Sequence, residues 1–225
     1  MLKIIGSIGD VAEGQAGLVT EQQAAAVGGT AAILQELLDS RVIEPVVPGV
    51  VRLRGGARPA FPRLYAQWLL LDPDRAAWDR ELPAAGVVSH TAAVRVYGVG
   101  NLPGPAAEFT VPLDHIGAPS EGVRLHLAGL EPDEYREVAG LPVTAPGRTL
   151  ADIAVEGSTD LEGLGRIATN FLARGLATRS ELAQALERGA QPTNELGIGA
   201  EQLSALLQSV DGVESAAPLE GRADG

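Results

Sequence analysis

Residues 17–53 read GLVTEQQAAAVGGTAAILQELLDSRVIEPVVPGVVRL, and this stretch decides the fold of the N-terminal part of the chain. Thr20 and Gln23 match a capping box, in which each side chain satisfies a backbone N–H of the other residue. The two glycines Gly28 and Gly29 end the first helix, because glycine adopts the left-handed conformation without a Cβ penalty. We therefore expect a first short helix over residues 21–27.

A second helix and a β-hairpin follow directly. Thr30 caps the second helix, residues 30–39, which carries an apolar stripe at helical spacing: Ile33, Leu34, Leu37 and Leu38. Two β-rich runs, 42–47 and 50–53, then flank Pro48-Gly49 and predict a hairpin. Apolar residues at helical spacing over residues 1–16 predict one more helix. Together these elements predict a winged helix-turn-helix over residues 1–56.

This layout indicates DNA binding, because a helix-turn-helix places its second helix in the major groove and a wing can follow the phosphates. The candidate DNA-contacting residues lie on the two helices, on the hairpin and just beyond it: Thr20, Thr30, Ala31, Gln35, Arg41, Arg52, Arg54 and Arg58. Residues 1–56 nevertheless carry four cationic residues against six carboxylates, and Glu36 lies on the predicted reading face. Phosphates would repel that carboxylate. Two hypotheses therefore stay open, a DNA-binding domain and a winged helix that only docks proteins.

The rest of the chain predicts a larger mixed α/β domain over residues 57–188 and a C-terminal helix with a flexible tail over 189–225, so the fold class is α+β. Glycines and a proline over residues 55–59 mark the first boundary, and the short linker suggests that the two parts pack together. Helices are predicted over residues 61–71, from about 75 to 82, and over 90–97, 145–155, 161–173, 180–186 and 199–208. Strands are predicted over residues 86–88, 109–111, 123–127, 137–138 and 141–143. Ser89 is placed to cap the helix that begins at His90.

The composition excludes several classes of protein. Cysteine is absent, which excludes disulfides, thiol catalysis and cysteine-based metal sites, and fits a reducing compartment. No apolar run reaches the 18 or so residues of a membrane span, and the N-terminus lacks the apolar region of a signal peptide, so we expect a cytoplasmic protein without membrane contact. The net charge of −12 becomes more acidic toward the C-terminus, which suits solubility or a basic protein partner.

The sequence predicts no catalytic site, metal or cofactor, and hence no enzyme. None of the three histidines lies at a ligand spacing from another, Asp114 and His115 supply only two ligands, and His90 is interpreted as structural. No Gly-x-Ser-x-Gly elbow is present. Lys3 is the only lysine, which argues against a third hypothesis, a nuclease or nucleotide-modifying enzyme.

Several motifs occur in an order that is typical of one family. They are LVTEQQAA at 18–25, the hairpin at 42–53, VVSHTAA at 87–93 followed by Tyr97-Gly98, RLH at 124–126, GLPVTAPGRTLAD at 140–152, and GLATRSEL at 175–182. On these motifs, residues 1–188 resemble the AbiEi-type antitoxins of type IV toxin–antitoxin systems.

The resemblance implies an N-terminal winged helix that binds operator DNA, often inverted repeats in the protein's own promoter, possibly as a homodimer. It also implies a C-terminal domain that counters a nucleotidyltransferase-like toxin. The protein would then be an antitoxin and transcriptional autorepressor without cofactor. Arg148 and Thr149 match the longest motif, and we expect them to have a structural role.

Overall fold

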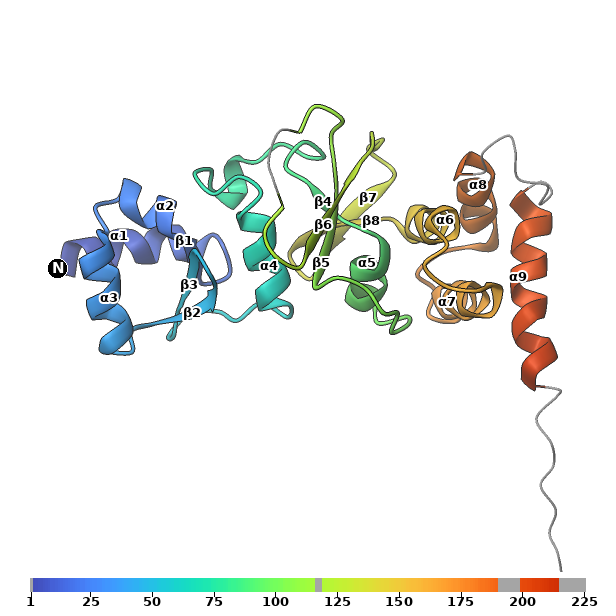
Figure 1. Ribbon diagram of the computed structural model, residues 1–225, viewed down its shortest axis with the longest axis horizontal. Helices are drawn as coiled ribbons and strands as arrows, with labels where there is room; N and C mark the ends of the chain where they lie inside the picture. The colour runs from blue at the N-terminus through green and yellow to red at the C-terminus, as the bar shows by residue number, and fades with distance from the viewer. Residues whose placement is uncertain (1, 116–118, 190–198, 215–225) are drawn as a thin grey trace, which may run out of the picture.

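The structure is a computed structural model that describes residues 2–115, 119–189 and 199–214, with side chains described up to residue 210. Figure 1 shows an elongated molecule with an N-terminal unit at one end, a sheet in the middle and four helices at the other end. The class is mixed α+β, as the sequence predicted. Within the described residues, no helix is both long and apolar enough to cross a bilayer.

The N-terminal unit combines three helices with a three-stranded antiparallel sheet of order β1-β3-β2. Its elements in chain order are α1 (Leu2–Glu13), β1 (Leu18–Thr20), α2 (Glu21–Ala26), α3 (Ala31–Asp39), β2 (Ile43–Val47) and β3 (Val50–Leu53). The three predicted helices and the hairpin are confirmed. Strand β1 was not predicted, because three residues that end at a helix cap are too few to show an alternation of polar and apolar side chains. It exists through its pairing with β3, in which Leu18 lies opposite Arg52.

Short-range hydrogen bonds set the ends of α2 and α3, as the sequence predicted. The Thr20 hydroxyl accepts from the Gln23 backbone N–H at 3.0 Å, and the side-chain oxygen Oε1 of Gln23 accepts from the Thr20 backbone N–H at 3.1 Å. Gly28 has a φ of +92°, a conformation that suits glycine after a helix. Thr30 accepts from the Ile33 N–H at 3.4 Å. These caps make α2, the turn after it and α3 a locally encoded segment.

The N-terminal unit has a small core of its own and also packs on the body. The small core contains Ile8, Val19, Ala24, Leu34, Leu37, Ile43 and Val51. The other face of its sheet contributes Leu18, Val47 and Val50 to the main core, beside α4 (Pro62–Leu69). This contact agrees with the expectation that a short linker brings the two parts together.

A five-stranded mixed sheet of order β6-β5-β4-β8-β7 forms the centre of the body. Its strands are β4 (Val87–Val88), β5 (Ala107–Val111), β6 (Val123–Leu127), β7 (Tyr135–Val138) and β8 (Leu141–Thr144). The β4–β8 and β5–β6 pairs are parallel, whereas β4–β5 and β7–β8 are antiparallel. All five strands overlap predicted ones. Because β5 and β6 run in parallel and in register, Glu108 on β5 pairs with Arg124 on β6.

Five helices complete the body: α5 (His90–Tyr97), α6 (Pro146–Glu156), α7 (Leu161–Ala173), α8 (Arg179–Gly189) and α9 (Gly199–Glu214). Helix α9 packs against α7 and α8 (Figure 1), and its Leu203 and Leu206 belong to the main core. The helix predicted after residue 189 therefore exists and is part of the body. The predicted flexible tail, residues 215–225, lies outside the described residues.

The prediction of a helix from about residue 75 to 82 is wrong. Turns and one short 3-10 helix, η1 (Ala77–Asp79), occupy this stretch. The reason is the buried Arg80, whose guanidinium donates to the carbonyl oxygens of Trp68 at 2.7 Å and Leu69 at 2.6 Å. These bonds fold the segment back onto the end of α4.

Candidate nucleic-acid interface and histidine cluster

The exposed face of α3 holds three of the predicted DNA-contacting residues. Thr30, Ala31 and Gln35 are all exposed, and they line a hollow between α2 and α3. Small side chains at the start of the helix let its backbone approach a groove closely. The Gln35 amide donates to the Asp39 carboxylate at 2.9 Å. This hydrogen bond would have to break before the amide could bond to a base.

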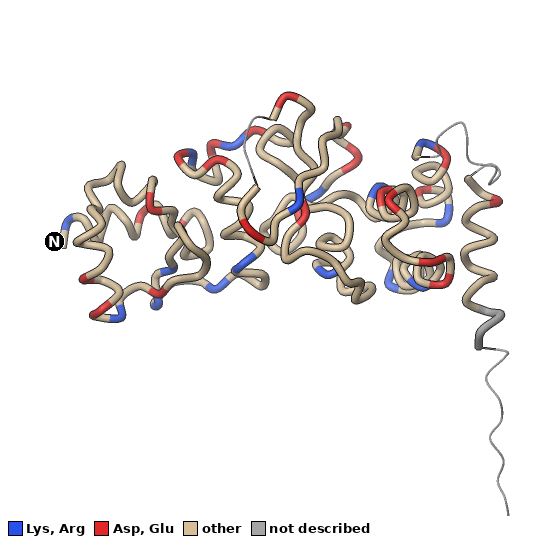
Figure 2. The backbone as a smooth tube through the Cα atoms, viewed as in Figure 1, with Lys and Arg blue, Asp and Glu red and all other residues tan. Residues whose placement is uncertain are grey.

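The charges on this face are mixed. Glu36 and Asp39 are exposed on α3, and Arg41 is exposed directly after it, with a φ of +57°. Figure 2 shows both acidic and basic positions on the N-terminal unit. The α3 face therefore has hydrogen-bonding groups and limited positive charge.

Glu44 on β2 brings the hairpin arginines together. Its carboxylate accepts from Arg52 at 2.7 and 2.9 Å and pairs with Arg54 at 3.3 Å. The hydrogen bond from Arg52 holds the pKa of Glu44 below its usual value, and the charges of Arg54 and Arg58 act in the same direction. One carboxylate thus offsets part of the positive charge that the hairpin would offer to phosphates.

Two of the predicted contact residues are buried. Thr20 is fully buried, and its hydroxyl donates to the Pro73 carbonyl oxygen at 2.6 Å. The Arg52 side chain is only 9% exposed and is engaged by Glu44. Neither side chain is accessible to a DNA duplex, because the sheet of the N-terminal unit packs on the body. Arg54 and Arg58 remain exposed.

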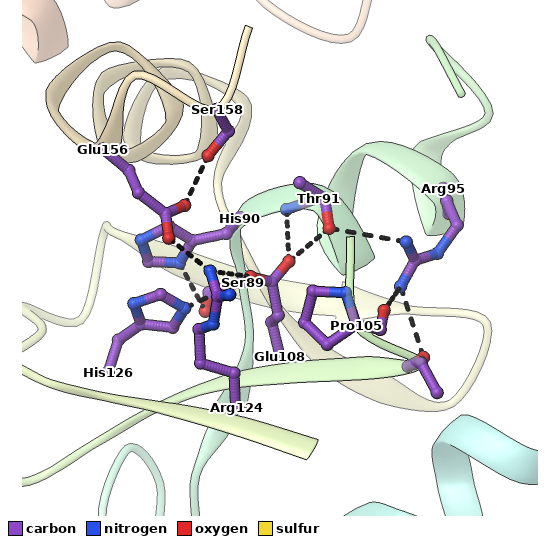
Figure 3. Close-up of polar contacts among 11 residues, drawn as sticks. Ser89, His90, Thr91, Arg95, Pro105, Glu108, Arg124, His126, Glu156 and Ser158 are labelled. Atoms are coloured by element: carbon purple, nitrogen blue, oxygen red, sulfur yellow. Dashed lines mark hydrogen bonds and ion pairs between the residues drawn. The ribbon is translucent and has the colours of Figure 1, made fainter. Parts of the chain in front are cut away.

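A second polar cluster lies in the body, centred on Glu108. This carboxylate is fully buried and accepts from the backbone N–H of Thr91 at 2.9 Å and from the Thr91 hydroxyl. Its other oxygen lies 3.4 Å from Nε2 of His126 (Figure 3). Burial acts to raise the pKa of Glu108, but the hydrogen bonds from His126 and Thr91 outweigh it and lower the pKa to about 2.

These bonds correct the prediction for Ser89. It precedes α5 as expected, but its side chain makes no capping bond to the helix. Its hydroxyl contacts Nδ1 of His90 at 2.9 Å instead, and Glu108 from β5 satisfies the N–H of Thr91. A carboxylate that is distant in sequence has replaced the local cap.

His90 is buried and stacks on His126. The two ring centroids lie 3.5 Å apart with an interplanar angle of 10°. His90 has a φ of +50°, an uncommon conformation for a residue other than glycine. Burial, and then repulsion from His126, lower the pKa of His90 to about 4, so its ring is neutral at pH 7.

Glu156, the last residue of α6, completes this group. One ligand atom from each of His90, His126 and Glu156 lies within 4.8 Å of the others. Arg124 donates to Glu156 at 2.7 Å, and the Ser158 hydroxyl donates to its other oxygen at 2.5 Å (Figure 3). We call His90, His126 and Glu156 the histidine cluster.

The histidine cluster opens into a hollow of about 540 Å³ that Arg148 and Asp152 also line. Arg148 pairs with Asp152 at 2.7 Å and with Glu134 at 3.1 Å, whereas Thr149 is buried and donates to the Thr144 carbonyl oxygen at 3.0 Å. These contacts agree with the structural role expected for the motif. Burial raises the pKa of Asp152 despite its pairing with Arg148.

The sequence analysis missed the histidine cluster. Its residues come from the start of α5, from β6 and from the end of α6, so no local spacing connects them. The alternating polar residues of β6 were visible in the sequence, but the partners across the sheet were not. Asp114 and His115, the pair considered in the sequence, belong to no three-ligand group among the described residues.

No protein-family model matches the chain, and no curated protein matches its sequence.

Proposed function

We propose that the protein is a DNA-binding antitoxin and transcriptional autorepressor of a type IV toxin–antitoxin system. The observation that carries this proposal is the element order α1-β1-α2-α3-β2-β3, with an exposed α3 after a glycine turn and a hairpin after α3. This order suits a winged helix-turn-helix, in which α3 enters the major groove and the hairpin is the wing. The resemblance of residues 1–188 to AbiEi-type antitoxins supports the same function.

In this proposal α3 reads the bases and the arginines around it hold the phosphates. Thr30 and Gln35 supply hydroxyl and amide groups, and Ala31 allows close approach of the helix. Arg41, Arg54 and Arg58 supply the charge. A homodimer would place two copies of α3 on the half-sites of an inverted repeat.

The body, in the same proposal, counters a nucleotidyltransferase-like toxin in the cytoplasm. Its support is the family resemblance together with the acidity of residues 156–225, which suits a basic protein partner. Neither activity requires a catalytic step or a cofactor.

A band-shift assay on DNA upstream of the protein's own gene tests the proposal. The wild-type protein should bind at low salt, and the double variant Arg41→Ala plus Arg54→Ala should bind at least tenfold more weakly, because two phosphate contacts are lost. Arg166→Ala is the matched control, since Arg166 is an exposed arginine on α7 in the body. Equal binding by the wild type and the double variant would contradict the proposed interface.

One observation favours a second candidate function, a protein-docking module. Glu36, Asp39 and Glu44 place negative charge on the helix and the hairpin that would face DNA. A basic protein surface would fit this unit better than a phosphate backbone does. Absence of band shift at low salt, together with co-purification of the toxin, would select this function.

A further inference from the structure

The histidine cluster has the donor set of a metal site. Two imidazoles and one carboxylate come from three separate elements, and one ligand atom from each lies within 4.8 Å of the others (Figure 3). Imidazole and carboxylate donors suit Zn²⁺ and its neighbours, and three protein ligands leave a fourth position open. We propose that His90, His126 and Glu156 bind one divalent transition-metal ion of the zinc class. This site is independent of the proposed DNA-binding function.

The groups behind the two imidazoles are those that metal-ligating histidines use. The second nitrogen of such a histidine usually donates to a carboxylate, a carbonyl or a hydroxyl group, which sets the tautomer. Nδ1 of His90 contacts the Ser89 hydroxyl at 2.9 Å, which leaves Nε2 as the ligand atom. Nε2 of His126 contacts Glu108 at 3.4 Å, which leaves Nδ1 as the ligand atom.

One ring has to turn when the ion binds. The rings are stacked with an interplanar angle of 10°, so their in-plane lone pairs lie in nearly parallel planes and do not meet at one point. His90 is buried and held by Ser89, whereas the His126 side chain is 19% exposed and its contact with Glu108 is long. His126 is therefore the mobile ligand, and it closes on a position set by His90 and Glu156.

Arg124 places a positive charge beside Glu156, one of the three proposed ligands. Its guanidinium lies 2.7 Å from Glu156 and 3.8 Å from Glu108, between two carboxylates that would otherwise repel each other. The Arg124 side chain is 54% exposed, so it can move into solvent when an ion arrives. A metal ion and Arg124 thus compete for the same carboxylate.

The hollow beside the cluster supplies a second, independent observation. Oδ2 of Asp152 is buried in its wall, with no hydrogen-bond partner in the part of the chain that the structure describes. Its other oxygen, Oδ1, is paired with Arg148 at 2.7 Å, which leaves Oδ2 able to accept a further donor or cation. The hollow also gives an ion a route to the cluster.

Zinc chloride, titrated into the chelator-treated full-length chain and followed by calorimetry, tests the site. We expect one equivalent to bind, and we expect His126→Ala and Glu156→Ala each to weaken binding by more than about 100-fold, above the roughly 10- to 100-fold cost of losing a supporting group such as the Ser89 hydroxyl. His115→Ala removes the third histidine and should leave binding unchanged. Circular dichroism should show that all variants remain folded; both substituted ligands lie at least partly at the surface.

Cobalt(II) and Arg124→Gln make the test specific. Cobalt(II) bound by nitrogen and oxygen ligands at a low coordination number should give a visible absorption band in the wild type and not in His126→Ala. Arg124→Gln should tighten zinc binding by roughly fivefold, because a competing charge is removed. No binding below millimolar zinc, equal binding by His126→Ala, loss of binding in His115→Ala, or weaker binding by Arg124→Gln would overturn the proposal.

Discussion

Glu44 shows how one side chain sets the charge that the hairpin presents. Its carboxylate engages both Arg52 and Arg54, and its pKa is lowered first by the hydrogen bond from Arg52 and further by the charges of Arg54 and Arg58. The sequence places all four residues within 15 positions but does not say which charge cancels which. Pairing across β2 and β3 sets Glu44 directly opposite Arg52, and this register removes Arg52 from the candidate interface.

Glu44→Gln should therefore strengthen DNA binding. The substitution keeps the shape of the side chain, removes one negative charge and leaves Arg54 free to reach a phosphate. We expect a tighter band shift and a slope of log K against log salt that steepens by about 0.9, the value for one added phosphate contact. Glu187→Gln makes the same charge change on α8 and is the control. If the two variants bind equally, hairpin charge does not control affinity.

At the scale of elements, the segment between α4 and β4 depends on Arg80. The guanidinium lies over the Trp68 ring at 4.5 Å and donates to the carbonyl oxygens of Trp68, Leu69 and Asp72. Burial lowers the pKa of Arg80 to about 10, so the group stays charged at pH 7. Its bonds add charged donors to the Trp68 and Leu69 carbonyls at the C-terminal end of α4, which also accept from the N–H groups of Leu71 and Asp72 at 3.2 and 3.3 Å.

Arg80→Met should destabilise the protein by about 3 kcal/mol, because it keeps the apolar stem but removes the charged hydrogen bonds to the carbonyl oxygens of Trp68, Leu69 and Asp72. Urea unfolding measures this as a lower midpoint at unchanged slope. Arg75→Met is the control in the same segment: Arg75 is 53% exposed in a single ion pair, so we expect a change below about 0.5 kcal/mol. Equal effects of the two substitutions would show that the carbonyl bonds are not what holds the segment.

At the scale of the whole molecule, the packing of the C-terminal helices requires a glycine where α7 and α9 meet. Gly165 of α7 is buried against α9, and a Cβ there would overlap the Leu206 carbonyl oxygen. The clash would be with backbone, so a rotamer change cannot relieve it. The approach of α9 to α7 therefore depends on a position without a side chain.

Gly165→Ala should displace α9 and cost about 1–3 kcal/mol, the usual cost of overpacking. Hydrogen exchange should increase in α9 and stay unchanged in α1–α3. Gly6→Ala is the control, since Gly6 lies in α1 with open space around it and alanine there should stabilise the helix by about 1 kcal/mol. Faster exchange throughout the chain, rather than in α9, would contradict this local coupling.

Much of the fold could be predicted from the sequence because its signals are local. The Thr20 capping box, the Gly28 turn and the apolar stripe of α3 each act within one helical turn, and all three appear in the structure. The failures have long-range causes. Strand β1 exists through β3, the expected helix near residues 75–82 gives way to Arg80, and the cap expected from Ser89 comes from Glu108.

Local sequence signals were enough to predict most of the helices and strands, including two short helices around a glycine turn and the hairpin after them. Tertiary packing sets which charged residues face solvent and which side chains distant in sequence lie together. It buried Thr20 and Arg52, and it brought His90, His126 and Glu156 together. The two kinds of feature differ in the range of the interactions that determine them. Caps and periodicity act over three or four residues, whereas the β5–β6 register and the packing of α6 that place these side chains depend on burying the whole core.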